Sequence, residues 1–144
     1  MKKVIVVTLA FLALACGSGK DKSAKAPLFT ILKQAGTGGA QIEFYEIIND
    51  GKEFELLKND PELKRKINKS NIDQSTFVVL SAGEKPTGGY GITVTDVKET
   101  NTEIEVYVQK TKPDPNSFVT MAITYPICIV QINSKKPLVF KEVE

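Results

Sequence analysis

The segment Thr76-Phe77-Val78-Val79-Leu80-Ser81-Ala82 carries four consecutive apolar residues, from Phe77 to Leu80. A strand with one face in water alternates apolar and polar residues, whereas a strand covered on both faces has no such alternation. The segment Ile127-Cys128-Ile129-Val130 shows the same uninterrupted apolar pattern. We therefore expect these two segments to be central strands, with other elements packed on both faces of their sheet.

Further segments on both sides of residues 76–82 have the composition of β-strands. Residues Glu103 to Gln109 alternate polar and apolar side chains, so we expect that strand to have one buried face and one wet face. Pro126 has no N–H to donate to a ladder, so we expect the run around it to bend into two strands. The predicted strands are Leu28 to Lys33, Ile42 to Ile48, Tyr90 to Val97, Glu103 to Lys110, Phe118 to Ile132 and Leu138 to Val143.

The connections between these strands favour antiparallel pairing. The glycine-rich stretch Ala35-Gly36-Thr37-Gly38-Gly39-Ala40 joins the first two strands and is typical of a hairpin with a loose turn. It lacks the Gly-Lys-Ser/Thr ending of a phosphate-binding loop. After residue 75 the connections are too short for the crossovers that parallel strands need.

One helical insertion is expected at about residues 50–68. Asn49 or Asp50 can cap a first helix, and Asp60-Pro61 is a second start signal, with Asp as the N-cap and Pro at the first helical position. Two short helices or one broken helix would fit, followed by a polar loop from Asn68 to Gln74. The predicted fold class is therefore mainly β, or β-rich α+β: an antiparallel sandwich-like or curved sheet with this helical insertion.

The first residues predict export and attachment to a membrane. Met1-Lys2-Lys3 precedes an apolar run that is shorter than the roughly 20 residues of a membrane helix, so residues 1–15 are expected to be a lipoprotein signal peptide. Leu12-Ala13-Leu14-Ala15-Cys16 resembles a bacterial lipobox, which implies lipidation of Cys16. A soluble secreted protein cut after Ala15 is the alternative. Residues 16–26 would then be the acylated cysteine and a flexible tether, and residues 27–144 a single domain.

The composition excludes much of enzyme chemistry. The chain of 144 residues has no His, which removes the commonest general base and the usual zinc and haem ligands. No catalytic residues, metal ligands or cofactor site are expected. Removing Lys2 and Lys3 would leave 17 basic residues against 17 acidic ones. The sequence shows no basic face of the kind that binds nucleic acid, so no nucleic-acid partner is expected. Cys128 lies in an apolar run without an adjacent cation, so we expect a buried, unreactive thiol.

The segment Gly83-Glu84-Lys85-Pro86-Thr87-Gly88-Gly89-Tyr90 between two predicted strands is unusual. Pro86 fixes one backbone angle, and the glycines can adopt positive φ at little cost. A rigid, shaped loop is expected. Two interpretations remain open: a contact surface for a partner, or a tight strand connection in which Tyr90 packs into the core.

The sequence from Phe77 to Ile92, with Glu105-Val106-Tyr107-Val108 and Thr120-Met121-Ala122-Ile123-Thr124-Tyr125-Pro126, resembles the C-terminal domain of the PrcB family. That family is named for a subunit of a surface protease complex. Its pattern of a strand, a GEKPTGGY loop, two strands, a proline-containing excursion and a Tyr-Pro strand occurs here in order across residues 76–132. The resemblance implies an envelope lipoprotein domain that associates with or stabilises a protease, and it implies no catalytic residues.

A second resemblance concerns the loop alone. Lys85-Pro86-Thr87-Gly88-Gly89-Tyr90 is similar to the Asn-Pro-Thr-Thr-Gly-Tyr/Phe loop of chagasin-type cysteine-peptidase inhibitors, which wedge such loops into an active-site cleft. A preformed loop loses little entropy on docking, so this use is physically reasonable. A small-ligand carrier is a third option, for which the sequence shows no apolar pocket.

The sequence thus predicts a non-enzymatic, lipid-anchored protein of the bacterial cell envelope, at the outer membrane because no Asp follows Cys16. Its partner would be a protein, in particular a protease, with contact to the membrane through Cys16 and none to nucleic acid. A peptidase inhibitor that uses the GEKPTGGY loop as a wedge is the alternative function. The expected partner-binding residues are Lys85, Pro86, Thr87, Gly88, Gly89, Tyr90, Tyr125 and Pro126.

Overall fold

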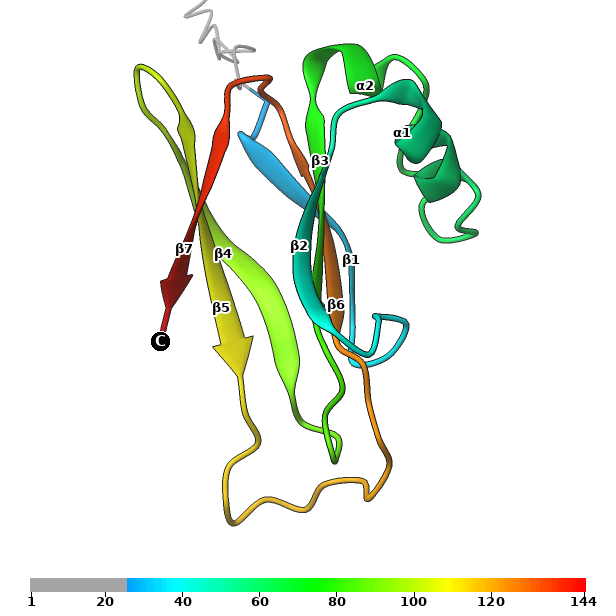
Figure 1. Cartoon of the computed structure of the whole chain (residues 1–144), viewed down its shortest axis with the longest axis vertical. Helices are drawn as coiled ribbons and strands as arrows, with labels where there is room; N and C mark the ends of the chain where they lie inside the picture. The colour runs from blue at the N-terminus through cyan, green and yellow to red at the C-terminus, as the bar shows by residue number, and fades with distance from the viewer. Residues whose placement is uncertain (1–25) are drawn as a thin grey trace, which may run out of the picture.

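The computed structural model describes residues 26–144, which form two β-sheets packed face to face (Figure 1). The larger sheet has the order β1-β6-β3-β2, with all neighbours antiparallel, and the smaller has the order β4-β5-β7. The strands are β1 (Phe29–Ala35), β2 (Glu43–Ile48), β3 (Thr76–Ala82), β4 (Gly91–Glu99), β5 (Ile104–Thr111), β6 (Ile127–Ile132) and β7 (Leu138–Val143). This two-sheet architecture confirms the β-rich fold class.

The core between the sheets is made by the inward side chains of the central strands. Every residue of β3 is buried, and β6 is buried at all positions except Gln131, so the prediction of two central strands is confirmed. On β5, buried and half-buried residues alternate, which confirms one dry face and one wetter face. The buried residues of this core are Val78, Leu80, Ala82, Ile92, Val94, Val97, Ile104, Val106, Val108, Cys128, Val130 and Ile132.

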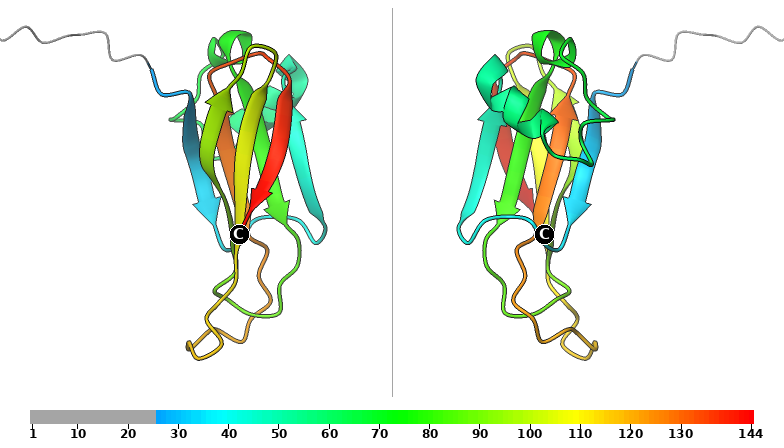
Figure 2. Two further views of the ribbon diagram at one scale, coloured as in Figure 1. Left: turned by 90° about the vertical axis from the view of Figure 1, so that its left-hand side faces the viewer. Right: turned by 90° about the vertical axis from the view of Figure 1, so that its right-hand side faces the viewer.

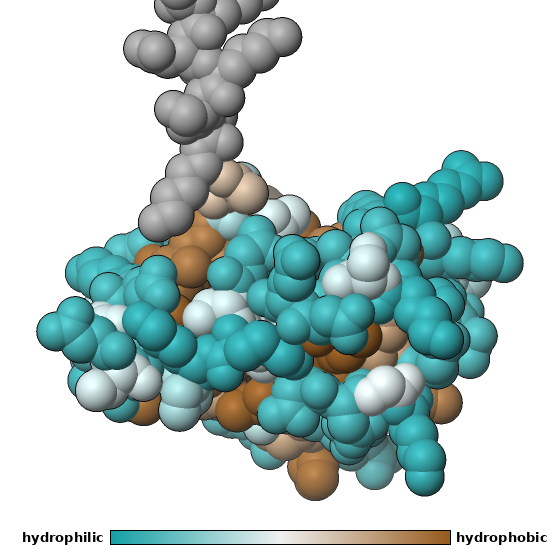
Figure 3. Space-filling view, turned by 90° about the horizontal axis from the view of Figure 1, so that it is seen from above, coloured by the Kyte–Doolittle hydropathy of each residue, from teal (hydrophilic) through white to brown (hydrophobic). Residues whose placement is uncertain are grey.

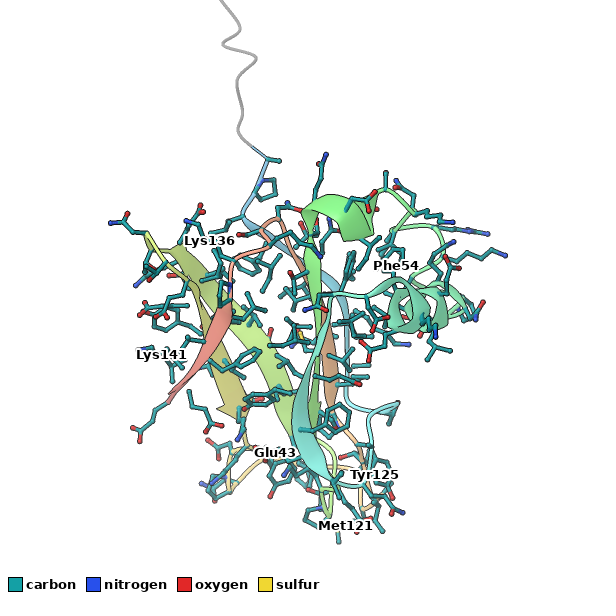
Figure 4. All side chains as sticks on the ribbon, turned by 45° about the horizontal axis from the view of Figure 1, so that its top comes forward. Glu43, Phe54, Met121, Tyr125, Lys136 and Lys141 are labelled. Atoms are coloured by element: carbon teal, nitrogen blue, oxygen red, sulfur yellow. The ribbon has the colours of Figure 1, made fainter. Side chains whose placement is uncertain are left out.

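A second apolar cluster covers the outer face of the larger sheet. Helix α1 (Gly51–Lys58) begins after Asp50, whose side chain accepts hydrogen bonds from the backbone N–H groups of Lys52 and Glu53. Phe54 faces the sheet from α1 and meets Phe77 with 5.0 Å between ring centroids (Figure 4). The uninterrupted apolar pattern of β3 is explained by this cluster, because Phe77 and Val79 pack under the helix rather than in water.

The remainder of the helical insertion differs from the expectation. Asp60 caps as predicted, with its carboxylate accepting from the Glu62 N–H, but residues 61–66 form successive turns rather than a second helix. Leu63 is nevertheless fully buried, so these turns still close the outer apolar cluster. A one-turn helix, α2 (Asn71–Gln74), occupies the predicted polar loop, since local hydrogen bonds such as Ser75 N–H to Asn71 O can close a single turn.

The predicted hairpin between the first two strands is wrong. β1 and β2 lie at opposite edges of the larger sheet, with β6 and β3 inserted between them (Figure 2). The glycine-rich connection crosses the lower end of the sheet instead of turning back, and there the Gly39 N–H donates to the Tyr125 carbonyl at 2.9 Å. A Cβ on Gly39 would come within 2.9 Å of that carbonyl oxygen, so the glycine is needed for the crossing.

Two further strand predictions need correction. β5 and β7 pair in parallel, although we expected antiparallel pairing after residue 75. Parallel strands need a long connection, and the chain between β5 and β7 provides one because it passes through β6 in the other sheet. The predicted strand from Phe118 to Ile132 is regular only from Ile127 onward, and residues 118–126 are an irregular segment with a single bridge at Thr124.

The two ends of the sandwich differ in character. Residue 26 and the helices lie at one end, whereas residues 83–90 and 112–126 extend from the opposite end (Figures 1 and 2). Hydrophilic side chains dominate the first end when it is viewed along the long axis (Figure 3). Within residues 26–144, no helix has the length and hydropathy required to cross a bilayer. The predicted signal peptide 1–15, the lipidation at Cys16 and nearly all of the tether lie outside the described residues.

Candidate functional site

The loop of residues 83–90 is fixed to the segment of residues 118–125 by backbone hydrogen bonds. Lys85 and Thr124 form an isolated antiparallel bridge, with 2.9 Å between N and O in both directions. The Gly88 N–H donates to the Thr120 carbonyl at 2.9 Å, and the buried Thr124 hydroxyl donates to the Thr87 carbonyl at 2.8 Å. The two segments therefore act as one paired element, which makes the predicted rigid loop physically reasonable.

The base of this loop is fixed on its other side as well. Gly83 has φ +76° and approaches the neighbouring chain so closely that a Cβ would be 3.0 Å from the Glu43 nitrogen. The Glu84 N–H donates to the Gln41 carbonyl at 2.9 Å. The loop is thus held between residues 41–43 and residues 118–125.

The aromatic residues predicted for the site lie at its base. Tyr90 is half-buried outside the two core clusters and lines a shallow pocket of about 310 Å³ with Gln34, Gly36 and Ile92. The Tyr125 hydroxyl donates to Glu84 Oε2 at 3.1 Å, and burial together with that hydrogen bond raises the pKa of Tyr125. Both rings are therefore accessible from the loop side, and neither is a core residue.

Pro126 has a different position from the other predicted site residues. Its side chain is fully buried, and its carbonyl accepts a hydrogen bond from the Ala82 N–H at 3.0 Å. It cannot touch a partner in this conformation, so its part in the site is to bend the chain. The exposed loop residues are Glu84, Pro86 and Gly89, whereas Lys85, Thr87 and Gly88 are half-buried.

Three highly exposed large apolar side chains at this end were missed by the sequence analysis. Phe118 is 107% exposed, Met121 89% and Ile123 57%, although we expected this segment to be a strand. Met121 and Tyr125 both lie near the bottom of the molecule as drawn in Figure 4. We call the three residues, together with the loop residues 85–89, the tip surface. The sequence did contain one signal against a strand here. Pro115 and Pro126 flank the segment, and prolines make a long regular strand unfavourable.

Within residues 26–144, no group of three or more potential metal ligands comes together, and no buried side-chain N or O lacks a hydrogen-bond partner. Cys128 is fully buried between the sheets, and burial raises the pKa of its thiol. Three exposed apolar side chains lie within residues 118–123, in a segment that hydrogen bonds at Thr120 and Thr124 join to the loop, and exposed apolar side chains close together mark interaction sites.

These features define the molecule as a β-sandwich whose paired loops present an apolar surface at one end. Residues 76–133 match the family model described as PrcB C-terminal, which confirms the resemblance noted from the sequence. The matched residues begin with β3 and include both segments of the tip surface.

One curated relative was found by sequence, an uncharacterized protein of Methanocaldococcus jannaschii. It is 37% identical over 71 residues, which cover 49% of this chain and 43% of that protein. The chain therefore spans less than half the length of the curated relative it matches. No solved structure matches this chain significantly.

Proposed function

We propose that this protein is a non-enzymatic, lipid-anchored envelope protein that binds a protease through the tip surface. The observation that carries the proposal is the exposure of Phe118, Met121 and Ile123 in a segment that backbone hydrogen bonds at Thr120 and Thr124 join to the loop of residues 83–90. Covering one such side chain yields about 1.5–3 kcal/mol. Because the surface is already rigid, little conformational entropy is lost on binding, and more of this energy contributes to affinity.

A protein is a better occupant of this surface than a small molecule. The tip projects from the end of the sandwich (Figure 1), whereas ligand sites are concave and surround most of the ligand. The match to a family named for a subunit of a protease complex supports a protease as the partner. Lipidation at Cys16 would place the domain at the outer membrane, and the tip surface lies at the end away from residue 26.

Charge substitutions on the tip surface test the proposal. Phe118→Asp and Met121→Asp should abolish co-purification with an envelope protease from detergent-solubilised membranes, because a buried carboxylate would cost more than the contact yields. Both side chains are exposed, so the unfolding midpoint should stay unchanged. Leu56→Asp is the matched control, since Leu56 is 72% exposed on α1 away from the tip. Equal capture of the protease by all three variants would refute a role for the tip surface.

Lipidation is tested separately by mass spectrometry of the native N-terminus. A diacylglycerol-modified Cys16 at the first position is expected, and an unmodified or absent Cys16 would remove the membrane anchor from the proposal. Membrane fractionation then shows which membrane holds the protein.

A peptidase inhibitor is the second candidate function, favoured by the projection of the paired loops and the fixed conformation of residues 85–89. Protein lacking residues 1–16 would be titrated into papain-like peptidases with a fluorogenic substrate. Slower hydrolysis that Thr87→Ala and Met121→Asp relieve would support the inhibitor. Unchanged hydrolysis at micromolar concentration would eliminate it and leave non-inhibitory binding.

A further inference from the structure

The two lateral sides of the sandwich are closed in different ways. On one side, β1 and β4 are close, and the Thr93 hydroxyl donates to the Gln34 side chain across the sheets at 3.3 Å. Both strands contain a register shift, in β1 between Ile31 and Lys33 and in β4 between Val94 and Asp96. Such bulges twist an edge and make it unsuitable for pairing with another strand.

The opposite side, between β2 and β7, is bridged by side chains. Tyr45 and Phe140 have ring centroids 5.2 Å apart, and the Tyr45 hydroxyl donates to Glu142 at 2.8 Å. Lys110 from β5 donates to Glu43 and Glu142, which ties the same two strands together. β2 pairs with β3 over six consecutive residues without a shift, and within residues 26–144 no strand pairs with its other edge.

A cavity of about 480 Å³ opens beside this bridge. Ile47 lies two residues beyond Tyr45 on the inward face of β2, and Leu138 lies two residues before Phe140 on β7. The cavity is lined by Ile47, Asn49, Thr76, Lys135, Lys136, Pro137 and Leu138. An apolar wall from both strands and two lysines therefore meet next to an unpaired strand edge.

We propose that an extended segment of a partner polypeptide pairs with the free edge of β2 and places an apolar and an acidic side chain in this cavity. Every second residue of an edge strand points its N–H and C=O groups away from the sheet, and another extended backbone satisfies both. Alternate side chains of the added strand fall on the inward face, where Ile47 and Leu138 provide apolar contact.

The charge of the cavity selects the acidic side chain. The Lys135 ammonium group donates to the Ser75 carbonyl at 3.2 Å, and no ion pair joins it to a carboxylate in the described part of the chain. Lys136, by contrast, already pairs with Glu99 at 2.9 Å. A carboxylate entering the cavity would give Lys135 a charged acceptor. The resulting charge-assisted hydrogen bond is stronger than the present one to a neutral carbonyl.

A second copy of this chain is a poorer occupant of the same edge. Glu43 and Glu46 lie on opposite faces of β2, and the inward one, Glu43, already pairs with Lys110 of its own chain, so a second β2 strand would bring no free carboxylate to the cavity. The proposed site is also separate from the tip surface, so a tip variant should leave strand addition intact. A result that refutes one proposal therefore does not refute the other.

Hydrogen exchange measured by NMR tests the proposal with a defined probe. The probe is a capped peptide in which threonine alternates with leucine and glutamate over the length of β2, added at millimolar concentration. Alternate amides of β2 should exchange at least about tenfold more slowly with the peptide, because only those amides face the added strand. The same peptide with proline in place of the central threonine lacks one N–H and should not protect them.

Two variants provide the matched comparison. Ile47→Lys should remove the protection, whereas Ile31→Lys, on the opposite edge strand β1, should retain it. The two variants are matched because both isoleucines are 38% exposed. Lys135→Glu should shift the preference to a peptide with lysine in place of glutamate. The proposal is overturned if the peptide leaves β2 unprotected, if Ile47→Lys has no effect, or if β2 becomes protected with rising protein concentration alone, which would mark a second copy.

Discussion

Gly89 and Pro113 are so close that residue 89 has no space for a side chain. A Cβ on Gly89 would lie 2.7 Å from Pro113 Cβ and 3.3 Å from Val119 Cγ1. Gly89 also has φ +85°, a backbone conformation that glycine adopts without the steric cost that a Cβ brings. This contact joins the loop of residues 83–90 to the excursion after β5, so the shape of the tip surface depends on Gly89.

Gly89→Ala should therefore lower the free energy of unfolding by about 1–3 kcal/mol, the range for a residue forced into a sparsely populated backbone conformation. The added methyl group must displace Pro113 or Val119, and the displacement should reach the adjoining Phe118. Urea denaturation measures the loss of stability, and amide chemical shifts of residues 112–123 report the movement.

Gly36→Ala is the control for this prediction. A Cβ on Gly36 would have no heavy atom within 4 Å, and its φ is not positive. Its effect should be within about 0.5 kcal/mol, as for an ordinary surface substitution. Equal losses for the two variants would show that the contact with Pro113 does not hold the tip.

The outer apolar cluster makes a separate prediction. Phe54 is 1% exposed and packs on Phe77, so Phe54→Ala should lower the free energy of unfolding by about 3–5 kcal/mol. Leu56→Ala, two residues away on the solvent side of α1, should change it by less than about 0.5 kcal/mol. Calorimetric unfolding of both variants measures the difference. Similar stabilities would mean that α1 contributes little to the sheet that it covers.

The strands could be predicted because their signals are local. The apolar run from Phe77 to Leu80 and the alternation from Glu103 to Gln109 each state how many faces of a strand are covered. Pairing is not local in this fold. The glycine-rich stretch after β1 is typical of a hairpin, but its glycines serve the close crossing at Tyr125, a residue far away in the sequence.

The tip surface shows the same division. Residues 85–89 were predicted because proline and glycine mark a shaped loop directly. Phe118, Met121 and Ile123 were assigned to a strand because apolar residues at nearly every position suit a buried strand equally well. The bridge from Thr124 to Lys85 keeps this segment at the loop rather than in a sheet, and that contact joins residues 39 positions apart.

The buried thiol leads to a chemical prediction. Cys128 is 0% exposed in the core between the sheets, and burial raises the pKa of its thiol, so little reactive thiolate exists at neutral pH. Alkylation by iodoacetamide at pH 8, followed by peptide mass spectrometry, should leave Cys128 unmodified in folded protein and modify it fully in urea. Rapid modification without urea would require that the two sheets separate frequently.

The bridge between β2 and β7 predicts a loss of stability at high pH. Burial and the hydrogen bond to Glu142 raise the pKa of Tyr45 to about 12, above the usual value of about 10. The folded protein then keeps a phenol proton that the unfolded chain releases, so this contribution is complete below about pH 10 and is lost as the pH rises towards about 12. The pKa of Lys110 is also raised, by its hydrogen bonds to Glu142 and Glu43 against the opposing effect of burial, and it acts in the same direction.

Urea denaturation at several pH values between 9 and 12 measures this loss, and tyrosinate absorbance follows the ring itself. Tyr45→Phe removes the proton, so its stability should fall less steeply over the same range. Tyr107→Phe should keep the steep fall, because Tyr107 takes no part in the bridge between β2 and β7. If Tyr45→Phe and the parent protein declined in parallel, the phenol would titrate equally in both states. The hydrogen bond from Tyr45 to Glu142 would then contribute nothing to the stability of the bridge between β2 and β7.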